Sequence, residues 1–324
     1  MPSNLTRVAV ACLVAATFTA SAQDYPNKSI TVVVPFAAGG PTDTLARNLG
    51  VTLTNTLKQQ VVVENTGGAG GTIGINKVAK AKNDGYTLLL MHIGMATAPA
   101  LYRTLPYDTM NDFEFIGQVA DVPMTMLGKK SLPPNNLKEL LPYLKANKDK
   151  LNYANAGIGA ASHLCGLLFM SRIETDLTSI SYKGTAPAMT DLLGGQVDLM
   201  CDQTTNTTQQ IKANTVKVYG VTSAQRVASL KEVPTLAEQG MKGFEVVVWH
   251  GFYAPKGTPK PIMDKLIAAL QAAVQDAPYK ARLAELGAEP VPLAKANPES
   301  LRIHLQAEIN KWAPVIKSAG IYAD

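Results

Sequence analysis

The sequence has few of the residues that mark several common protein classes. Only three of its 324 residues are cysteines, which are too few for a disulfide-rich scaffold and too widely spaced for a zinc site. The 30 basic and 25 acidic residues are scattered, without a basic cluster among aromatics, so we expect no nucleic-acid partner. No apolar run reaches the ~18 residues that span a bilayer, which excludes a polytopic membrane protein.

The sequence motifs of common enzymes are also missing. The glycine-rich stretch from Gly67 to Gly74 does not fit a dinucleotide loop, because Ile73 stands where the third glycine should fall. Neither a Walker A loop nor a Gly-x-Ser-x-Gly elbow is present, and the four histidines include no pair at metal-ligand spacing. We therefore expect no catalytic residue, no cofactor and no metal. A secreted oxidoreductase or hydrolase is the least favoured alternative.

The first 22 residues have the pattern of a secretory signal peptide. Arg7 precedes the apolar stretch from Val8 to Ala20, and Ala20-Ser21-Ala22 supplies small residues on either side of a cleavage site. We expect export to the periplasm, cleavage after Ala22 and no insertion into the membrane afterwards. The alternative is a buried N-terminal helix. The remaining length suits two domains of about 150 residues each.

Short β-branched runs alternate with helical patterns along the rest of the chain, as in α/β proteins with largely parallel sheets. Predicted strands cover residues 30–35, 60–64, 86–91, 115–119, 124–127, 180–182, 197–200, 216–221 and 244–248. The first predicted helix begins at residue 41. The others cover residues 73–82, 137–145, 162–172, 187–193, 261–277 and 297–317. No internal repeat and no Gly/Ser linker occurs, so a second domain would arise where the chain crosses over.

Glycine-rich loops that follow predicted strands and open helices suit anion binding, because a helix N-terminus presents free N–H groups and a favourable dipole. The first loop is Phe36 to Asp43, with Ala38, Gly39, Gly40 and Thr42 between them. Its glycines lack a Cβ and allow close approach to the backbone. Asp43 is expected to stabilise the first helical turn, with contact to a cationic ligand group as the alternative.

Two further loops have the same order of strand, glycine, hydroxyl and helix. In Gly157 to His163 we expect Ser162 to cap the helix, and His163 to bond either a carboxylate or a neighbouring carbonyl. The other loop, Tyr182 to Pro187, contains Lys183, Gly184 and Thr185. Such loops at the carboxyl ends of strands predict a cleft for a small anion.

Several stretches, in the same order along the chain, resemble the periplasmic substrate-binding receptors of tripartite tricarboxylate transporters, called Bug or TctC receptors. The resemblance covers essentially the whole chain after residue 22. The stretches are Tyr25-Pro26, Val34-Pro-Phe-Ala-Ala-Gly-Gly-Pro-Thr-Asp43 with Ala46-Arg47, Val63-Glu-Asn-Thr-Gly-Gly-Ala-Gly-Gly71, Asp84-Gly-Tyr-Thr-Leu88, Leu105-Pro-Tyr-Asp108 with Asp112-Phe113, Ser162-His-Leu164, Tyr182-Lys-Gly-Thr185 with Gly194-Gly195, Val233-Pro-Thr235, and Trp249 with Ala254-Pro255.

The resemblance implies a two-lobed Venus-flytrap of the type II periplasmic binding class. It also implies a carboxylate held by backbone amides and waters between the loops 36–43 and 182–187. The chain departs from similar receptors at Met91 to Thr97, where they have more Ser and Thr, so His92 and Thr97 become candidates for selectivity.

The cysteines that would remain after export are expected to form a disulfide, since the periplasm is oxidising. Cys165 should lie in the first turns of the helix after Ser162, and Cys201 at the end of a strand, just before Asp202. A bridge would hold Asp202, a further candidate for the site, close to His163. The alternative is two buried thiols.

Lobe 1 is expected to contain residues 23–121 and 250–324, and lobe 2 residues 122–249. The chain would cross near Gln118–Pro123 and near Val248–Phe252. We expect a monomeric receptor that captures a small carboxylate and delivers it to membrane permease subunits. The alternative role is a sensor that presents its ligand to a histidine kinase.

Overall fold

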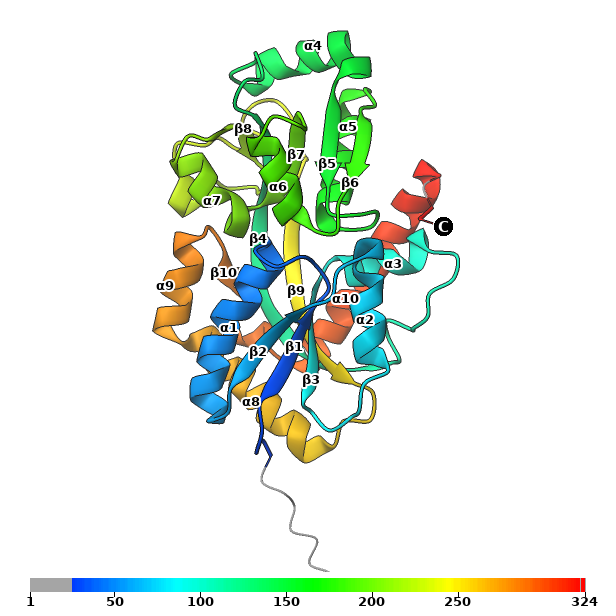
Figure 1. The fold of residues 1–324 in the computed structure, drawn as a ribbon, viewed down its shortest axis with the longest axis vertical. Coiled ribbons are helices and arrows are strands. Elements are labelled where there is room, and N and C mark those ends of the chain that lie inside the picture. The colour runs from blue at the N-terminus through cyan, green and yellow to red at the C-terminus, as the bar shows by residue number, and fades with distance from the viewer. Residues whose placement is uncertain (1–24, 321, 324) are drawn as a thin grey trace, which may run out of the picture.

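A computed structural model describes residues 25–320 and 322–323, and the expected signal peptide at residues 1–22 lies outside this part of the chain. The described chain forms two α/β lobes that follow one another along the long axis of the molecule (Figure 1). The strands follow the path β2-β1-β3-β9-β4-β7-β5-β6, and β8 and β10 both pair with β4. This arrangement is the two-lobed α/β fold expected from the sequence.

The first lobe, lower in Figure 1, is built around the strands β2, β1, β3 and β9 and the first half of β4. β1 lies parallel between β2 and β3, and β9 is antiparallel to both β3 and β4. The strands are β1 (Ile30–Val34), β2 (Val61–Asn65), β3 (Thr87–His92), β9 (Val247–Pro255) and β10 (Glu289–Pro290). The α-helices are α1 (Pro41–Leu57), α2 (Thr72–Ala79), α3 (Gly94–Leu101), α8 (Lys260–Gln275), α9 (Ala277–Glu285) and α10 (Pro298–Ala319).

The second lobe, upper in Figure 1, is built on β5, which lies parallel between β6 and β7. Its strands are β5 (Asn152–Asn155), β6 (Thr178–Ser181), β7 (Leu199–Gln203) and β8 (Val216–Val221). Its α-helices are α4 (Leu137–Asn147), α5 (Ala161–Ile173), α6 (Thr185–Leu193) and α7 (Thr204–Lys212). Sequence patterns predicted neither β5 nor α7 here, and they also missed α3 in the first lobe.

The long strand β4 (Phe113–Lys129) belongs to both lobes. Its first half, as far as Pro123, pairs with β9, and its second half, from Met124, pairs with β7 and β8. Two separate strands were predicted here, which is wrong. Pro123, which has no N–H to donate, lies where the strand passes from one sheet to the other, within the crossing predicted near Gln118–Pro123. β4 is antiparallel to its partners, so the sheets are mixed, not largely parallel.

Helix boundaries follow the local sequence. α1 has Pro41 at its start, Asp43 in its first turn, and Leu45, Leu49 and Leu53 buried along one face. α10 begins after Asn297, whose side chain accepts a hydrogen bond from the Ser300 N–H, as expected of a helix cap. The helix predicted for residues 261–277 ends at Gln275, where Asp276 caps a new helix.

Candidate ligand-binding cleft

A small cavity lies between the two lobes, where the strands of both lobes end and helices begin. The first lobe contributes Phe36, Pro41, Thr42 and His92 to its lining, and the second contributes Ala156, Ala161, Ser162, Thr185, Asp202 and Gln203. The N-termini of α1, α5 and α6 meet here, and the first N–H groups of each helix have no partner within the helix. The cavity volume is about 20 Å³, which is room for about one water molecule.

The loops of the two lobes touch around this cavity. The Ala37 N–H donates to the Lys183 carbonyl over 3.0 Å, which joins the first loop to the Tyr182–Pro187 loop. The Thr97 hydroxyl donates to the Gly159 carbonyl, also over 3.0 Å. The structure therefore has its lobes closed, and it brings together the loops that were predicted to face one another.

Within the first loop, Asp43 binds its own surroundings. Its Oδ2 accepts hydrogen bonds from the Gly39 N–H and from Arg47 Nε, both 2.9 Å long, and its Oδ1 accepts one from Asn65. Burial would raise the pKa of Asp43, but the hydrogen bonds from Arg47, Gly39 and Asn65 lower it below its usual value. Asp43 thus holds the turn in place, and the Gly39 amide, predicted to face a ligand, is already bonded.

Other residues of the first loop differ in their distance from the cavity. Thr42 and Phe36 line it, whereas Ala38, Gly39 and Gly40 do not. A Cβ on Gly40 would lie 3.8 Å from the Thr185 hydroxyl of the second lobe, an ordinary contact distance, so the approach of the loops does not require a glycine at this position.

Ser162 is not the helix cap that the sequence suggested. α5 begins one residue earlier, at Ala161, and its cap residue is Ala160, which has no oxygen to offer in its side chain. The Ser162 hydroxyl instead accepts a hydrogen bond from the Ala156 N–H over 2.8 Å, and so ties the start of α5 to the preceding loop. It nevertheless lines the cavity.

His163, the next residue, supports the same loop. Its Nδ1 accepts a hydrogen bond from the Gly159 N–H over 3.3 Å, which is neither the carboxylate nor the carbonyl contact expected from the sequence. Burial lowers the pKa of His163 to about 4, which keeps the ring neutral. The ring is not part of the cavity lining.

In the third loop, only Thr185 lines the cavity. It is the first residue of α6, and its buried hydroxyl makes no hydrogen bond of normal geometry in the described structure. Lys183 is exposed and contributes its carbonyl to the contact between the lobes. Gly184 lies where a Cβ would be 2.9 Å from the Ala37 nitrogen, and Pro187 is half-buried within α6.

His92 ends β3 and stacks on Phe36, with 4.7 Å between the ring centroids. Its Nδ1 accepts a hydrogen bond from the Gly94 N–H, so a neutral ring carries its proton on Nε2. Burial lowers the pKa of His92 to about 3. His92 is therefore a neutral hydrogen-bond donor in the wall, whereas Thr97 bridges the lobes outside the cavity lining.

Asp202 lies within β7, not after it as predicted, and its side chain is 1 % exposed. Its Oδ1 accepts a hydrogen bond from the Gln203 N–H, and its Oδ2 accepts one from Asn206 Nδ2 over 2.6 Å. Burial raises the pKa of Asp202 to about 7, although Asn206, Gln203 and Thr185 favour the charged form. No Lys or Arg belongs to the cavity lining.

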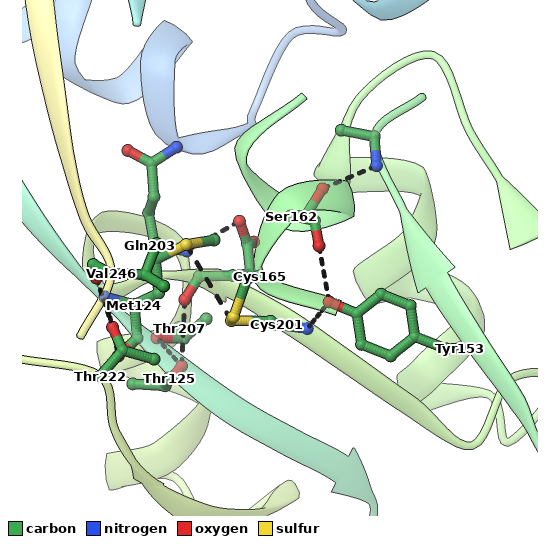
Figure 2. Close-up of a disulfide and its surroundings, with 12 residues drawn as sticks. Met124, Thr125, Tyr153, Ser162, Cys165, Cys201, Gln203, Thr207, Thr222 and Val246 are labelled. Atoms are coloured by element: carbon green, nitrogen blue, oxygen red, sulfur yellow. Dashed lines mark hydrogen bonds between the residues drawn. A yellow bond between two sulfur atoms is a disulfide. The ribbon is translucent and has the colours of Figure 1, made fainter. Parts of the chain in front are cut away.

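Sequence patterns missed Pro41, Ala156, Ala161 and Gln203. Gln203 extends from β7 toward the first lobe (Figure 2), and its buried Oε1 has no hydrogen-bond partner in the described structure. The available signal was its place directly after Asp202, since a polar pair at the end of a buried strand is typical of a site.

The cavity wall of the second lobe is fastened by a disulfide between Cys165 of α5 and Cys201 of β7, the pairing expected from the sequence. Beside it, the Tyr153 hydroxyl donates to the Ser162 carbonyl and accepts the Cys201 N–H (Figure 2). These contacts connect the strand that carries Asp202 to the helix that carries Ser162.

Within the described residues, no cluster of His, Cys, Asp and Glu side chains could hold a metal ion. In the same part of the chain, no helix is long and apolar enough to cross a membrane.

Comparisons with known proteins agree with this geometry. The model of the tripartite tricarboxylate transporter family receptor, TctC, matches residues 45–321. The structure of the periplasmic binding protein BugD is 55 % identical, with a TM-score of 0.90, over 92 % of this chain and 99 % of BugD. MatC from Rhodopseudomonas palustris with bound malate is 39 % identical, with a TM-score of 0.86, over 90 % and 100 %.

A third structure, R. palustris Rpa4515 with adipate, is 35 % identical, with a TM-score of 0.88, over 92 % of this chain and 99 % of its own. These matches extend over nearly the whole described chain, so they cover both lobes and the cleft between them. The chain therefore belongs to the tripartite tricarboxylate transporter receptor family, whose members are periplasmic solute-binding proteins of the type II fold and not enzymes.

Proposed function

We propose that this receptor captures a small carboxylate in the periplasm and delivers it to the permease subunits of a tripartite tricarboxylate transporter. The observation that supports this most is the convergence of the α1, α5 and α6 N-termini on one cavity between the lobes. Free N–H groups and the positive ends of three helix dipoles favour an anion there without any cationic side chain. MatC holds malate and Rpa4515 holds adipate.

The ligand would be held by neutral donors. Thr42, Ser162, Thr185 and His92 line the cavity and offer three hydroxyls and one ring N–H, although the Thr42 hydroxyl also lies 3.4 Å from His250 Nε2. Thr185 Oγ1 is buried and makes no hydrogen bond of normal geometry in the described structure, although it lies close enough to Asp202 to favour the charged form of that carboxyl group. A ligand carboxylate would supply an acceptor in better geometry.

A dicarboxylate needs more room than about 20 Å³. Binding therefore requires the lobes to open and to close again around the ligand, with β4 and β9 as the hinge. We propose lobe boundaries at 23–121 with 250–324 and at 122–249. β9 begins at Val247, so the return of the chain to lobe 1 begins slightly before residue 250.

The proposal extends to the cellular setting. The first 22 residues would direct export and be removed after Ala22, and the mature receptor would act as a monomer without inserting into the membrane. N-terminal sequencing of the protein purified from the periplasm tests the cleavage: a mature chain starting at Gln23 supports it, and an intact Met1 contradicts it.

Calorimetric titration with malate, adipate, citrate and L-aspartate tests ligand binding. Thr185→Val removes the buried hydroxyl that has no hydrogen bond of normal geometry and keeps the side-chain volume, and it should weaken binding about tenfold. The control is Thr190→Val on the same helix, since that hydroxyl is exposed and bonds the Ala186 carbonyl. Equal affinity of both variants for the bound acid would contradict the assignment of Thr185 to the site, and failure of every carboxylate to bind would contradict the proposed function.

A further inference from the structure

The cavity proposed for a carboxylate already contains a carboxyl group in its wall. Asp202 lines the cavity, is 1 % exposed and sits at the junction of β7 and α7. If the proposed function holds, two carboxyl groups share one buried space. Like charges at close range in a medium of low dielectric disfavour one another strongly, and one of the pair then takes up a proton.

The elements around Asp202 provide hydrogen-bond donors but no cation. The Gln203 N–H and Asn206 Nδ2 donate to its two oxygens, and the nearby Thr185 hydroxyl also favours its charged form. Thr125 of β4 is opposite Asp202 in the sheet, and its hydroxyl donates to the Asp202 carbonyl and not to the carboxyl. Tyr153 of β5 donates its hydroxyl hydrogen to the Ser162 carbonyl.

The charged side chains on the elements around Asp202 either interact with other residues or lie at the ends of those elements that are distant from Asp202. On β4, Lys129 pairs with Asp198, and on α6, Asp191 accepts a hydrogen bond from Tyr182. Arg172 is in the last turn of α5 and Lys212 is the exposed last residue of α7. From the first lobe, α1 presents Asp43 already paired with Arg47.

The titratable groups nearest the cavity are histidines that stay neutral. Burial lowers the pKa of His92 to about 3 and that of His163 to about 4, and burial together with the neighbouring His92 lowers the pKa of His250 well below its usual value. None of these rings gains or loses a proton between pH 6 and 8. Asp202 is thus the group in the cavity wall whose protonation state can change between pH 6 and 8.

We propose that the receptor takes up one proton from solution when it binds a carboxylate, and that Asp202 carries this proton and donates it in a hydrogen bond to the ligand. The Asp202 carboxylate, a proton and the ligand carboxylate become a neutral Asp202 carboxylic acid bonded to the ligand anion, so charge and atoms balance. A hydrogen bond of this kind, O–H to O⁻, is among the shorter and stronger ones in proteins.

Burial supports the proposal further, because it raises the pKa of Asp202 in the closed structure to about 7. The group is then mostly protonated at pH 6 and mostly charged at pH 8. A ligand carboxylate, with a pKa of about 4 in water, stays charged over this range. The affinity for malate should accordingly fall about tenfold between pH 6 and pH 8.

Titration of malate, and then of adipate, in buffers with different enthalpies of ionisation counts the protons directly. Binding at pH 8 should take up close to one proton per ligand, and binding at pH 6 close to none. Asp202→Asn should bind with an affinity that is constant across this range and without proton uptake. Asp191→Asn, away from the cavity, should keep the pH profile of the native protein.

Asn206→Ala provides a second test that does not depend on how well Asp202→Asn folds. Loss of the Asn206 hydrogen bond removes a group that favours the charged carboxylate, so the pH at which malate affinity falls should rise. Malate binding with no proton uptake at pH 8 and a flat pH profile would overturn the inference and leave the proposed function standing. Tight binding of L-aspartate without proton uptake would also overturn it, because a charged Asp202 would then pair with the ligand ammonium group. If no carboxylate binds at any pH, the proposed function fails as well.

Discussion

Replacing Gly70 with alanine should prevent the lobes from closing. Gly70 lies in the short 3-10 helix Ala69–Gly71 of the first lobe, with φ +59°, and faces the carbonyl of Ile158 in the second lobe. A Cβ added at Gly70 would lie 2.0 Å from the Ile158 oxygen. Ordinary contacts begin at about 3.4 Å, so the lobes would have to move apart by more than an ångström at this point.

The expected cost follows from that overlap. Forcing one extra carbon into a packed contact costs about 3 kcal/mol when the neighbours are backbone atoms that cannot rotate away. Binding that depends on closure should therefore weaken about 100-fold. Gly70 packs in the contact between the lobes and is not part of the hydrophobic core, so the thermal midpoint of the empty protein should change little.

Calorimetry with malate and small-angle scattering with and without malate measure the two effects. Gly70→Ala should bind weakly and should not contract on addition of malate. Gly195→Ala is the matched control, because Gly195 also has a positive φ, +75°, but nothing lies within 4 Å of an added Cβ. If Gly70→Ala contracts and binds like the native protein, closure through the Gly70–Ile158 contact is refuted.

Two further predictions concern stability. The double variant Cys165→Ala, Cys201→Ala should have a free energy of unfolding that is lower by about 4 kcal/mol, since the bridge closes a 36-residue loop. Reduction of the native protein should have the same effect in a denaturant titration. Unchanged unfolding midpoints would argue against the bridge. The Asp202 pKa of about 7 in the folded protein lies above its ordinary value of 3.8, so the native state binds more protons between these pH values and its stability falls as pH rises from about 4 to 7. Asp202→Asn should remove up to about 4 kcal/mol of that fall in thermal melts, and identical pH dependence of both proteins would contradict the raised pKa.

The sequence was informative wherever a local pattern decides the structure. Pro41 and Asp43 place the start of α1, and Asn297 places the start of α10. The convergence of the three loops also followed from sequence, because loops after neighbouring strands meet at one edge of a sheet. Phe36, Thr42, His92, Ser162, Thr185 and Asp202 all came to line the cavity.

The sequence could not predict hydrogen bonds between residues that are distant along the chain. Asp43 uses the Gly39 amide together with Asn65, which belongs to another strand, so the amide predicted for a ligand is already bonded. Ser162 was predicted to cap the helix, but its hydroxyl accepts a hydrogen bond from the Ala156 N–H instead. Gln203 enters the cavity because β7 extends three residues beyond its predicted end.

A crystal structure of the receptor with malate or adipate, whichever binds in the titrations, would test the central claim most directly. We predict closed lobes with a ligand carboxylate in hydrogen-bond contact with the α6 N-terminus and the Thr185 hydroxyl, and within reach of Asp202. A ligand found elsewhere, such as in the separate groove lined by Pro123, Val247 and Arg226, would contradict it.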